Sequence, residues 1–227
     1  MSDETAKAVQ EVAKTTTVAI NAAEKAGGFL AEFIRGPLSE AVGIWTDNLR
    51  VRRFENLLSL RARVMKSIEA AGAEIDLRQI PLSIGVPLLE AASLEEDELL
   101  QEKWANLLIK FADASSGVSM QKAFGSVLAA MSPLEAMILD KIYSLAPPAP
   151  GEEPGILTEQ LPESATRMPS GTGGRPPDPS EEVQLAISNL LRLGCLGPAT
   201  VFDGGELLSV VYESAFGRAL HRACSGE

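Results

Sequence analysis

Apolar residues recur at alternating spacings of four and three along residues 3–34. This spacing is typical of a heptad seam, in which a narrow apolar stripe of one helix meets a partner helix. It predicts a long heptad-patterned helix over residues 1–35. The partner of this seam is another part of the chain, a second copy or another protein. The candidate interface residues on it are Val9, Ala13, Ile20, Leu30 and Ile34.

Further helices follow from apolar spacing and capping residues. Thr46 is expected to cap a helix over residues 47–71, with apolar positions on one side and arginines on the other. A compact apolar helix covers residues 80–92. Ser93 and Glu96 then match the S-x-x-E capping box and predict the start of the next helix. The expected apolar stripe of the 47–71 helix is Val51, Phe54, Leu57, Leu58, Val64 and Ile68.

Two shorter helices complete this helical part. Pro37 follows a glycine and favours a short helix over residues 37–45, because proline suits the first helical position. Ser119 is expected to cap a helix over residues 120–131. Together these elements predict a helical N-terminal domain over residues 1–131.

The remaining residues, 132–227, predict a second domain of mixed type. Ser132 and Glu135 form another capping box, which opens a helix reaching residue 145. Residues 146–179 hold nine of the fourteen prolines and predict a flexible insertion, apart from one or two helical turns at residues 156–161. Ser180 then caps a helix over residues 181–193.

A β-hairpin and a terminal helix end the chain. Strands are expected at residues 199–202 and 207–212, flanking the turn sequence Asp203-Gly204-Gly205. A short helix follows at residues 214–223. The order of helix, helical turn, helix and hairpin is that of a winged helix-turn-helix. The predicted fold is therefore mainly α, with a winged-helix-like α+β module at the C-terminus.

Composition agrees with this fold class and restricts the partners. Apolar residues make up 45% of the 227 residues but aromatic residues only 5%, which favours helices built on aliphatic cores. The net charge of −11 disfavours both phosphate backbones and anionic membrane surfaces. Residues 132–227 carry six Lys or Arg against thirteen Asp or Glu, a net charge of −7. DNA binding by the winged-helix-like module is therefore not expected.

Few residues suggest chemistry. The only histidine is His221, and the two cysteines, Cys195 and Cys224, do not form a CxxC motif, so zinc sites lack ligands. His221 has no visible orienting partner, and no nucleophile–base pair is apparent. We therefore expect no catalytic residues, no metal, no cofactor and no small-molecule substrate. The start of the chain lacks a basic region followed by an apolar run, so a cytoplasmic protein is expected.

Three other features have a structural and a functional interpretation. Trp104 is either a core residue or an interface anchor, and the core interpretation is favoured. The acidic run at residues 95–98 either caps a helix or binds a cation, and capping is favoured. The arginines of the 47–71 helix form either a solvated face that pairs with glutamates or a contact for nucleic acid or lipid. Pairing is favoured, because exposed pairs are common.

Four segments together resemble one bacterial family. The first two are Pro81-Leu82 with residues 87–95, and Leu99 with Trp104-Ala105-Asn106-Leu107-Leu108. The third is Met131-Ser132-Pro133-Leu134-Glu135-Ala136. The last combines Asn189-Leu190-Leu191-Arg192-Leu193-Gly194 with Phe216-Gly217-Arg218-Ala219. Through these four segments the chain resembles the Abi-alpha family of abortive-infection proteins. The resemblance implies a role in phage defence and supplies no catalytic residues.

The sequence thus leads to one main functional hypothesis and two alternatives. The main hypothesis is a non-enzymatic phage-defence protein that acts through protein–protein interaction. The first alternative is a membrane-associated toxic effector that uses the N-terminal helix, by analogy with other abortive-infection effectors. The second is a winged-helix DNA-binding regulator, against which the local charge argues.

Overall fold

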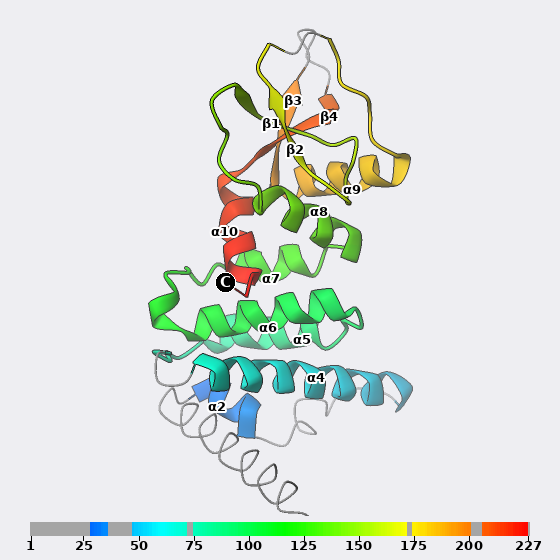
Figure 1. Cartoon of the computed structure of the whole chain (residues 1–227). Coiled ribbons are helices and arrows are strands. Elements are labelled where there is room, and N and C mark those ends of the chain that lie inside the picture. Colours follow the sequence, from blue (N-terminus) through cyan, green and yellow to red (C-terminus); the bar gives the residue numbers. More distant parts are fainter. Residues whose placement is uncertain (1–27, 36–46, 72–74, 172–173, 201–205, 227) are drawn as a thin grey trace, which may run out of the picture. The chain divides into compact units, whose positions relative to one another are not determined.

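The computed structural model of the chain describes residues 28–35, 47–71, 75–171, 174–200 and 206–226 (Figure 1). It is mostly helical, with a small four-stranded antiparallel sheet in the C-terminal part, which confirms the predicted fold class. The chain divides into two compact units. The N-terminal unit comprises Met1–Ala129 with Ala223–Glu227, and the C-terminal unit comprises Ala130–Arg222.

The N-terminal unit is built from helices. Its central element is α6, whose Trp104, Leu107 and Phe111 are almost completely buried. Helix α4 packs along α6, and the shorter helices α5 and α7 also contact α6. The elements are α2 (Gly28–Arg35), α4 (Asp47–Ala71), α5 (Leu82–Ala92), α6 (Glu98–Ala112), the 3-10 helix η2 (Ala114–Ser116) and α7 (Lys122–Leu128).

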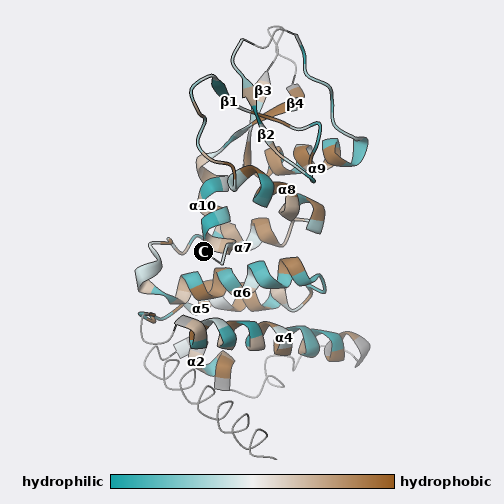
Figure 2. Cartoon of the chain, in the orientation of Figure 1, coloured by the Kyte–Doolittle hydropathy of each residue, from teal (hydrophilic) through white to brown (hydrophobic). Residues whose placement is uncertain are grey.

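Helix α4 has the predicted bounds, and its predicted apolar stripe is buried in part but shifted at some positions. The buried residues Leu57, Leu60, Val64 and Ile68 follow the three-and-four spacing of one helix face. Leu58, which the predicted stripe included, is exposed because it lies one residue away from this face. Apolar and polar bands accordingly alternate along α4 in Figure 2. The stripe prediction was also wrong at Val51, which is exposed.

The arginines of α4 pair with glutamates of the same unit. Arg52 lies 2.9 Å from Glu96, and Arg63 lies 2.9 Å from Glu102. Asn56 also donates a hydrogen bond of 3.0 Å to the carbonyl of Ser93. The two ion pairs agree with the interpretation that the arginines of α4 pair with glutamates. The glutamates come from the turn between α5 and α6 and from α6 itself.

The predicted capping box at Ser93 was wrong. The side chain of Asp97 caps α6 and accepts hydrogen bonds from the backbone N–H groups of Leu99, at 3.0 Å, and Leu100, at 3.1 Å. Ser93 instead stands at the C-terminal end of α5 and donates to the carbonyl of Glu90. Both residues suit a cap, but Ser93 has a helical backbone conformation at the end of α5, whereas Asp97 has the extended conformation that a cap requires.

Replacement of Asp97 by alanine should lower the free energy of unfolding by about 1 kcal/mol, because two backbone N–H groups lose their acceptor. Urea denaturation measures this loss. Glu96→Ala is the control, since it removes only an exposed ion pair and should cost less than about 0.5 kcal/mol. A larger loss of unfolding free energy for Glu96→Ala than for Asp97→Ala would support the predicted capping box of Ser93 and Glu96.

The prediction of a Ser119 cap was also wrong. Helix α7 begins at Lys122, and Gln121 stands at its cap position without a side-chain capping bond. Ser119 instead accepts a hydrogen bond from the side chain of Gln121. The helix is shorter than predicted because the chain turns again at Ala129, before the second unit begins.

The C-terminal unit combines helices with a sheet. At the start of α8, Ser132 accepts from the N–H of Glu135 while the Glu135 carboxylate accepts from the N–H of Ser132, which confirms the predicted capping box. Ser180 caps α9 as predicted, through the N–H of Val183. The elements are α8 (Pro133–Tyr143), β1 (Glu152–Leu157), β2 (Thr166–Pro169), α9 (Glu181–Arg192), β3 (Leu196–Thr200), β4 (Glu206–Glu213) and α10 (Ala215–Cys224), the last of which ends in the N-terminal unit.

The helical turn predicted at residues 156–161 was wrong, because Glu152–Leu157 form strand β1, and the segment predicted as a flexible insertion also contains β2. Strand β1 pairs with both β2 and β4, and the strand order is β2-β1-β4-β3. Ile156 lies opposite Val211 and is completely buried. Pro154 lies where the β1–β2 register shifts, which is where a strand tolerates proline. The predicted hairpin corresponds to β3 and β4, whereas the winged-helix-like comparison stays a prediction.

Candidate functional site

Helix α5 is apolar around most of its circumference, yet only Gly85, Leu88 and Ala92 are buried. The outward side carries Leu82 and Val86, one helical turn apart, which are 64% and 43% exposed. We call Leu82, Val86 and the neighbouring Glu90 the α5 outer face. A helix that is apolar around most of its circumference normally packs on most sides, so the exposed apolar side chains of α5 mark it as a candidate contact surface.

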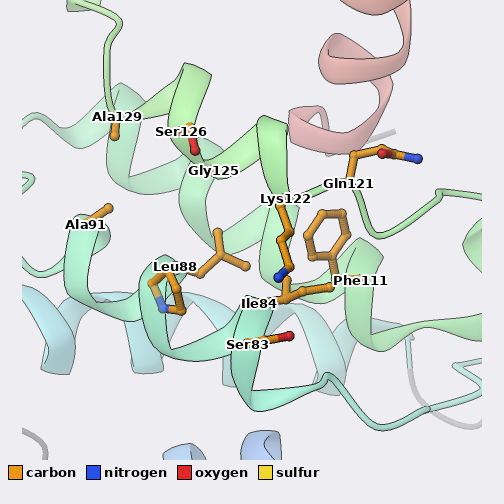
Figure 3. Close-up of a pocket in the computed structure, with 11 residues that line it drawn as sticks. Ser83, Ile84, Leu88, Ala91, Phe111, Gln121, Lys122, Gly125, Ser126 and Ala129 are labelled. Carbon is orange, nitrogen blue, oxygen red and sulfur yellow. The ribbon is translucent and has the colours of Figure 1, made fainter.

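A second side of α5 borders a pocket of about 500 Å³ (Figure 3). This α5–α7 pocket lies between α5 and α7, and Phe111 of α6 contributes to its wall. Its volume is within the range of small-molecule sites, roughly 300–1,000 Å³. The lining residues are Ser83, Ile84, Pro87, Leu88, Ala91, Phe111, Gln121, Lys122, Gly125, Ser126 and Ala129.

Gly125 sets the distance between α5 and α7 beside this pocket. A Cβ atom at this position would lie 3.2 Å from Leu88 Cδ2 and 3.8 Å from the ring of Trp104. The first distance is shorter than an ordinary carbon–carbon contact. The missing side chain therefore allows α7 to approach α5 closely here, while the pocket remains open alongside.

Lys122 is the only titratable residue among those that line the pocket. Its side chain runs from the first turn of α7 into the pocket, toward Ile84 and Leu88 (Figure 3). In the described part of the chain no carboxylate forms an ion pair with it. The pocket thus combines apolar walls with one positive charge.

A buried cation lies on the α4 side of α5. Arg53 of α4 is 8% exposed, and burial lowers the pKa of its guanidinium, while the nearby Glu90 carboxylate acts in the opposite direction. The Glu90 carboxylate therefore has a nearby cation, Arg53. Lys122, by contrast, has no carboxylate partner among the described residues.

The predicted interface residues are only partly described. Val9, Ala13 and Ile20 lie outside the described residues, as does most of the predicted first helix. Leu30 belongs to α2, and Ile34 of the same helix is buried. Trp104 is 2% exposed and lies in the core, which leaves it little surface for a partner.

In the C-terminal unit, polar residues form a network that joins elements of the fold. The Tyr143 hydroxyl donates to the carbonyl of Cys195 at 2.7 Å and accepts from the N–H of Ser214 at 2.9 Å. Burial raises the pKa of the Cys195 thiol to about 12 and also raises the pKa of Tyr143. Such a thiol stays protonated at neutral pH, so it is a poor nucleophile.

His221 has a neighbour that the sequence did not reveal. Its Nε2 lies 3.4 Å from a carboxylate oxygen of Asp140, and its ring stacks on Tyr143 with centroids 5.6 Å apart. No described group of three or more His, Cys, Asp or Glu residues could hold a metal ion. Among the helices of the described ranges, none has the length and apolarity needed to cross a bilayer.

Sequence reasoning missed the α5–α7 pocket, because its lining comes from segments up to 46 residues apart, from Ser83 to Ala129. One signal was available, namely that residues 80–92 are apolar around most of a helix rather than on one narrow stripe. Lys122 and Gly125 gave no signal, since each is unremarkable until α7 is placed against α5.

Comparison with known proteins identifies a family. The family model described as "Abortive infection alpha" matches residues 52–224, which is more than half of the chain and includes α5, α6, α7 and the whole C-terminal unit. No curated protein and no solved structure matches the chain significantly. The match confirms the resemblance that the four sequence segments indicated, and the chain belongs to the Abortive infection alpha family.

Proposed function

We propose that this protein defends bacteria against phage without catalysing a reaction, by binding a protein partner in the cytoplasm through the α5 outer face. Membership of the Abortive infection alpha family supports the defence role. The partial exposure of an apolar helix, α5, is the observation that carries the binding role.

The geometry of α5 suits one kind of partner. Leu82 and Val86 are four residues apart and therefore form a short ridge on one side of the helix. A ridge of this kind packs into the groove of an amphipathic helix. Because the chain carries a net charge of −11, a partner helix with a basic rim would be attracted to it.

The double variant Leu82→Ser/Val86→Ser tests this proposal in bacteria that express the full chain. Both side chains are already exposed, so the variant should fold, whereas the partner would lose two apolar contacts. Losses of more than about 1 kcal/mol for each anchor weaken binding more than about tenfold in combination. We expect plaque counts on the variant strain to rise to the level of cells without the protein.

Leu185→Ser is the matched control, because Leu185 is 68% exposed on α9, in the other unit. It should protect as well as the parent. Full protection by the Leu82/Val86 variant would exclude the α5 outer face, and a parent chain that never reduces plaque counts would refute the defence role itself.

A further inference from the structure

The α5–α7 pocket has a property that the proposed partner contact does not use. It lies on a different side of α5 from Leu82 and Val86, which are not among its lining residues. Its apolar lining is closed on one side by the aromatic ring of Phe111. Its single charge is the ammonium of Lys122, which has no carboxylate partner in the described residues.

We infer that the α5–α7 pocket binds a long unbranched carboxylate, a fatty acid, with its chain along α5 and its carboxylate at Lys122. Methylene groups have no hydrogen-bonding capacity, so they suit walls formed by Ile84, Leu88 and Phe111. An extended peptide would bring one backbone N–H and one C=O group for each residue into the same space, more than the four polar side chains of the lining can pair.

The charge pattern selects the head group. A carboxylate at Lys122 gains a charge-assisted hydrogen bond, and the ammonium gains the counter-ion that it lacks within the described chain. Three polar residues, Ser83, Gln121 and Ser126, also line the pocket and have side chains that can donate to a carboxylate. A cationic amphiphile with the same chain would be repelled by Lys122.

The volume sets the range of chain lengths. A pocket of about 500 Å³ accepts a ligand of drug-like size, which includes medium and long fatty acids. Each buried methylene contributes about 0.8 kcal/mol, which corresponds to about fourfold in affinity. Affinity should therefore rise steeply with chain length until the chain reaches the end of the pocket.

Titration of the full-length protein with octanoate, decanoate and dodecanoate, followed by methyl NMR and calorimetry, tests the inference. We expect about fourfold tighter binding for each added methylene, with shifts at the methyl groups of Ile84 and Leu88. Decyltrimethylammonium, which has a cationic head on a ten-carbon chain, should bind at least tenfold more weakly than decanoate.

Two variants locate the site. Lys122→Met should weaken decanoate binding about fivefold and leave the binding of decanol unchanged, because only the charge contact is lost. Ala91→Phe should fill the pocket and abolish binding of both. Lys141→Met, an exposed lysine on α8, is the control and should bind decanoate like the parent. If Ala91→Phe does not fold, Lys122→Met and the chain-length series decide the question.

Several outcomes would overturn the inference. These are an affinity that does not depend on chain length, equal binding of decanoate by Lys122→Met, and shifts distributed over the whole protein. An acidic helical peptide that shifts Ile84 and Leu88 when decanoate does not would assign the pocket to a protein. Failure here is distinct from failure of the proposed function, because Leu82→Ser/Val86→Ser should still bind decanoate.

Discussion

Replacement of Gly217 by alanine is expected to destabilise the C-terminal unit by about 3 kcal/mol or more. In an ordinary helix this change would stabilise by about 1 kcal/mol, because alanine is the better helix former. The sign reverses here because a Cβ atom at position 217 in α10 would overlap the carbonyl oxygen of Cys195 and the hydroxyl of Tyr143.

Neither of these neighbours can move aside easily. The Cys195 carbonyl belongs to the backbone turn after α9, where Gly194 holds a left-handed conformation with φ of 72°. The Tyr143 hydroxyl is fixed by its bonds to Cys195 and Ser214. Any relief of the overlap would therefore separate α10 from α8 and β3, and the network that joins them would be lost.

Gly197→Ala provides a matched control in the same unit. A Cβ there would lie 3.4 Å from Tyr212 Cβ, an ordinary contact, so we expect a change below about 1 kcal/mol. Hydrogen exchange with mass spectrometry on the full chain measures both units at once. Peptides of residues 130–222 should exchange faster in Gly217→Ala, while those of α4 and α6 keep their rates. Unchanged exchange in residues 130–222 would show that α10 accommodates the methyl group.

The same glycine illustrates what sequence reasoning can provide. The segment from Phe216 to Ala219 was recognised as part of a family pattern, but the reason for a glycine in it was not visible. The atoms that exclude a side chain come from residues 143 and 195, which are distant in sequence. A local pattern therefore marked the position, and only the tertiary fold explained it.

Local signals predicted the fold well where they were sufficient by themselves. The capping box at Ser132 needs only residues within one helical turn, and it forms as expected. The choice between Ser93 and Asp97 as the cap of α6 was not local, because both side chains suit the role and the backbone path decides between them. The stripe of α4 failed similarly at Leu58, where α6 selected the adjacent face.

The sheet and the pocket depended on long-range packing. Composition predicted a flexible insertion at residues 146–179, and β1 forms within it because Ile156 and Leu157 pair with Val211 and Val210 on β4, more than fifty residues later. The α5–α7 pocket likewise exists only once α7 is placed beside α5. Charge, by contrast, was available from the sequence, and it still argues against nucleic acid as the partner.

The most consequential residue in the proline-rich segment is Arg167 of β2. Its guanidinium donates to the carbonyls of Ala146 and Pro154 and lies 2.6 Å from the carboxylate of Glu213. The side chains of Arg167 and Glu213 are only 7% and 12% exposed. Arg167 thus joins the segment after α8, strand β1 and the end of β4, and it orders a segment whose composition favours disorder.

Replacement of Arg167 by methionine keeps an unbranched apolar side chain in place of the arginine stem and removes the guanidinium with these bonds. Loss of one partner from a buried ion pair costs about 3–5 kcal/mol, but Glu213 retains Arg218 at 2.8 Å, so we expect about 2–3 kcal/mol. Arg175→Met is the matched control, because the Arg175–Asp178 pair is exposed and should contribute less than about 0.5 kcal/mol.

Urea denaturation measures the loss for Arg167→Met, and hydrogen exchange locates it. We expect faster exchange in β1 and β2, whose alignment depends on Arg167, and smaller changes in α9. Equal stability of the two arginine variants would mean that strand pairing alone orders residues 146–171. The difference in unfolding free energy between the two arginine variants therefore decides what orders residues 146–171. The alternatives are the hydrogen bonds of the buried Arg167 and the strand pairs of Ile156 and Leu157 with β4.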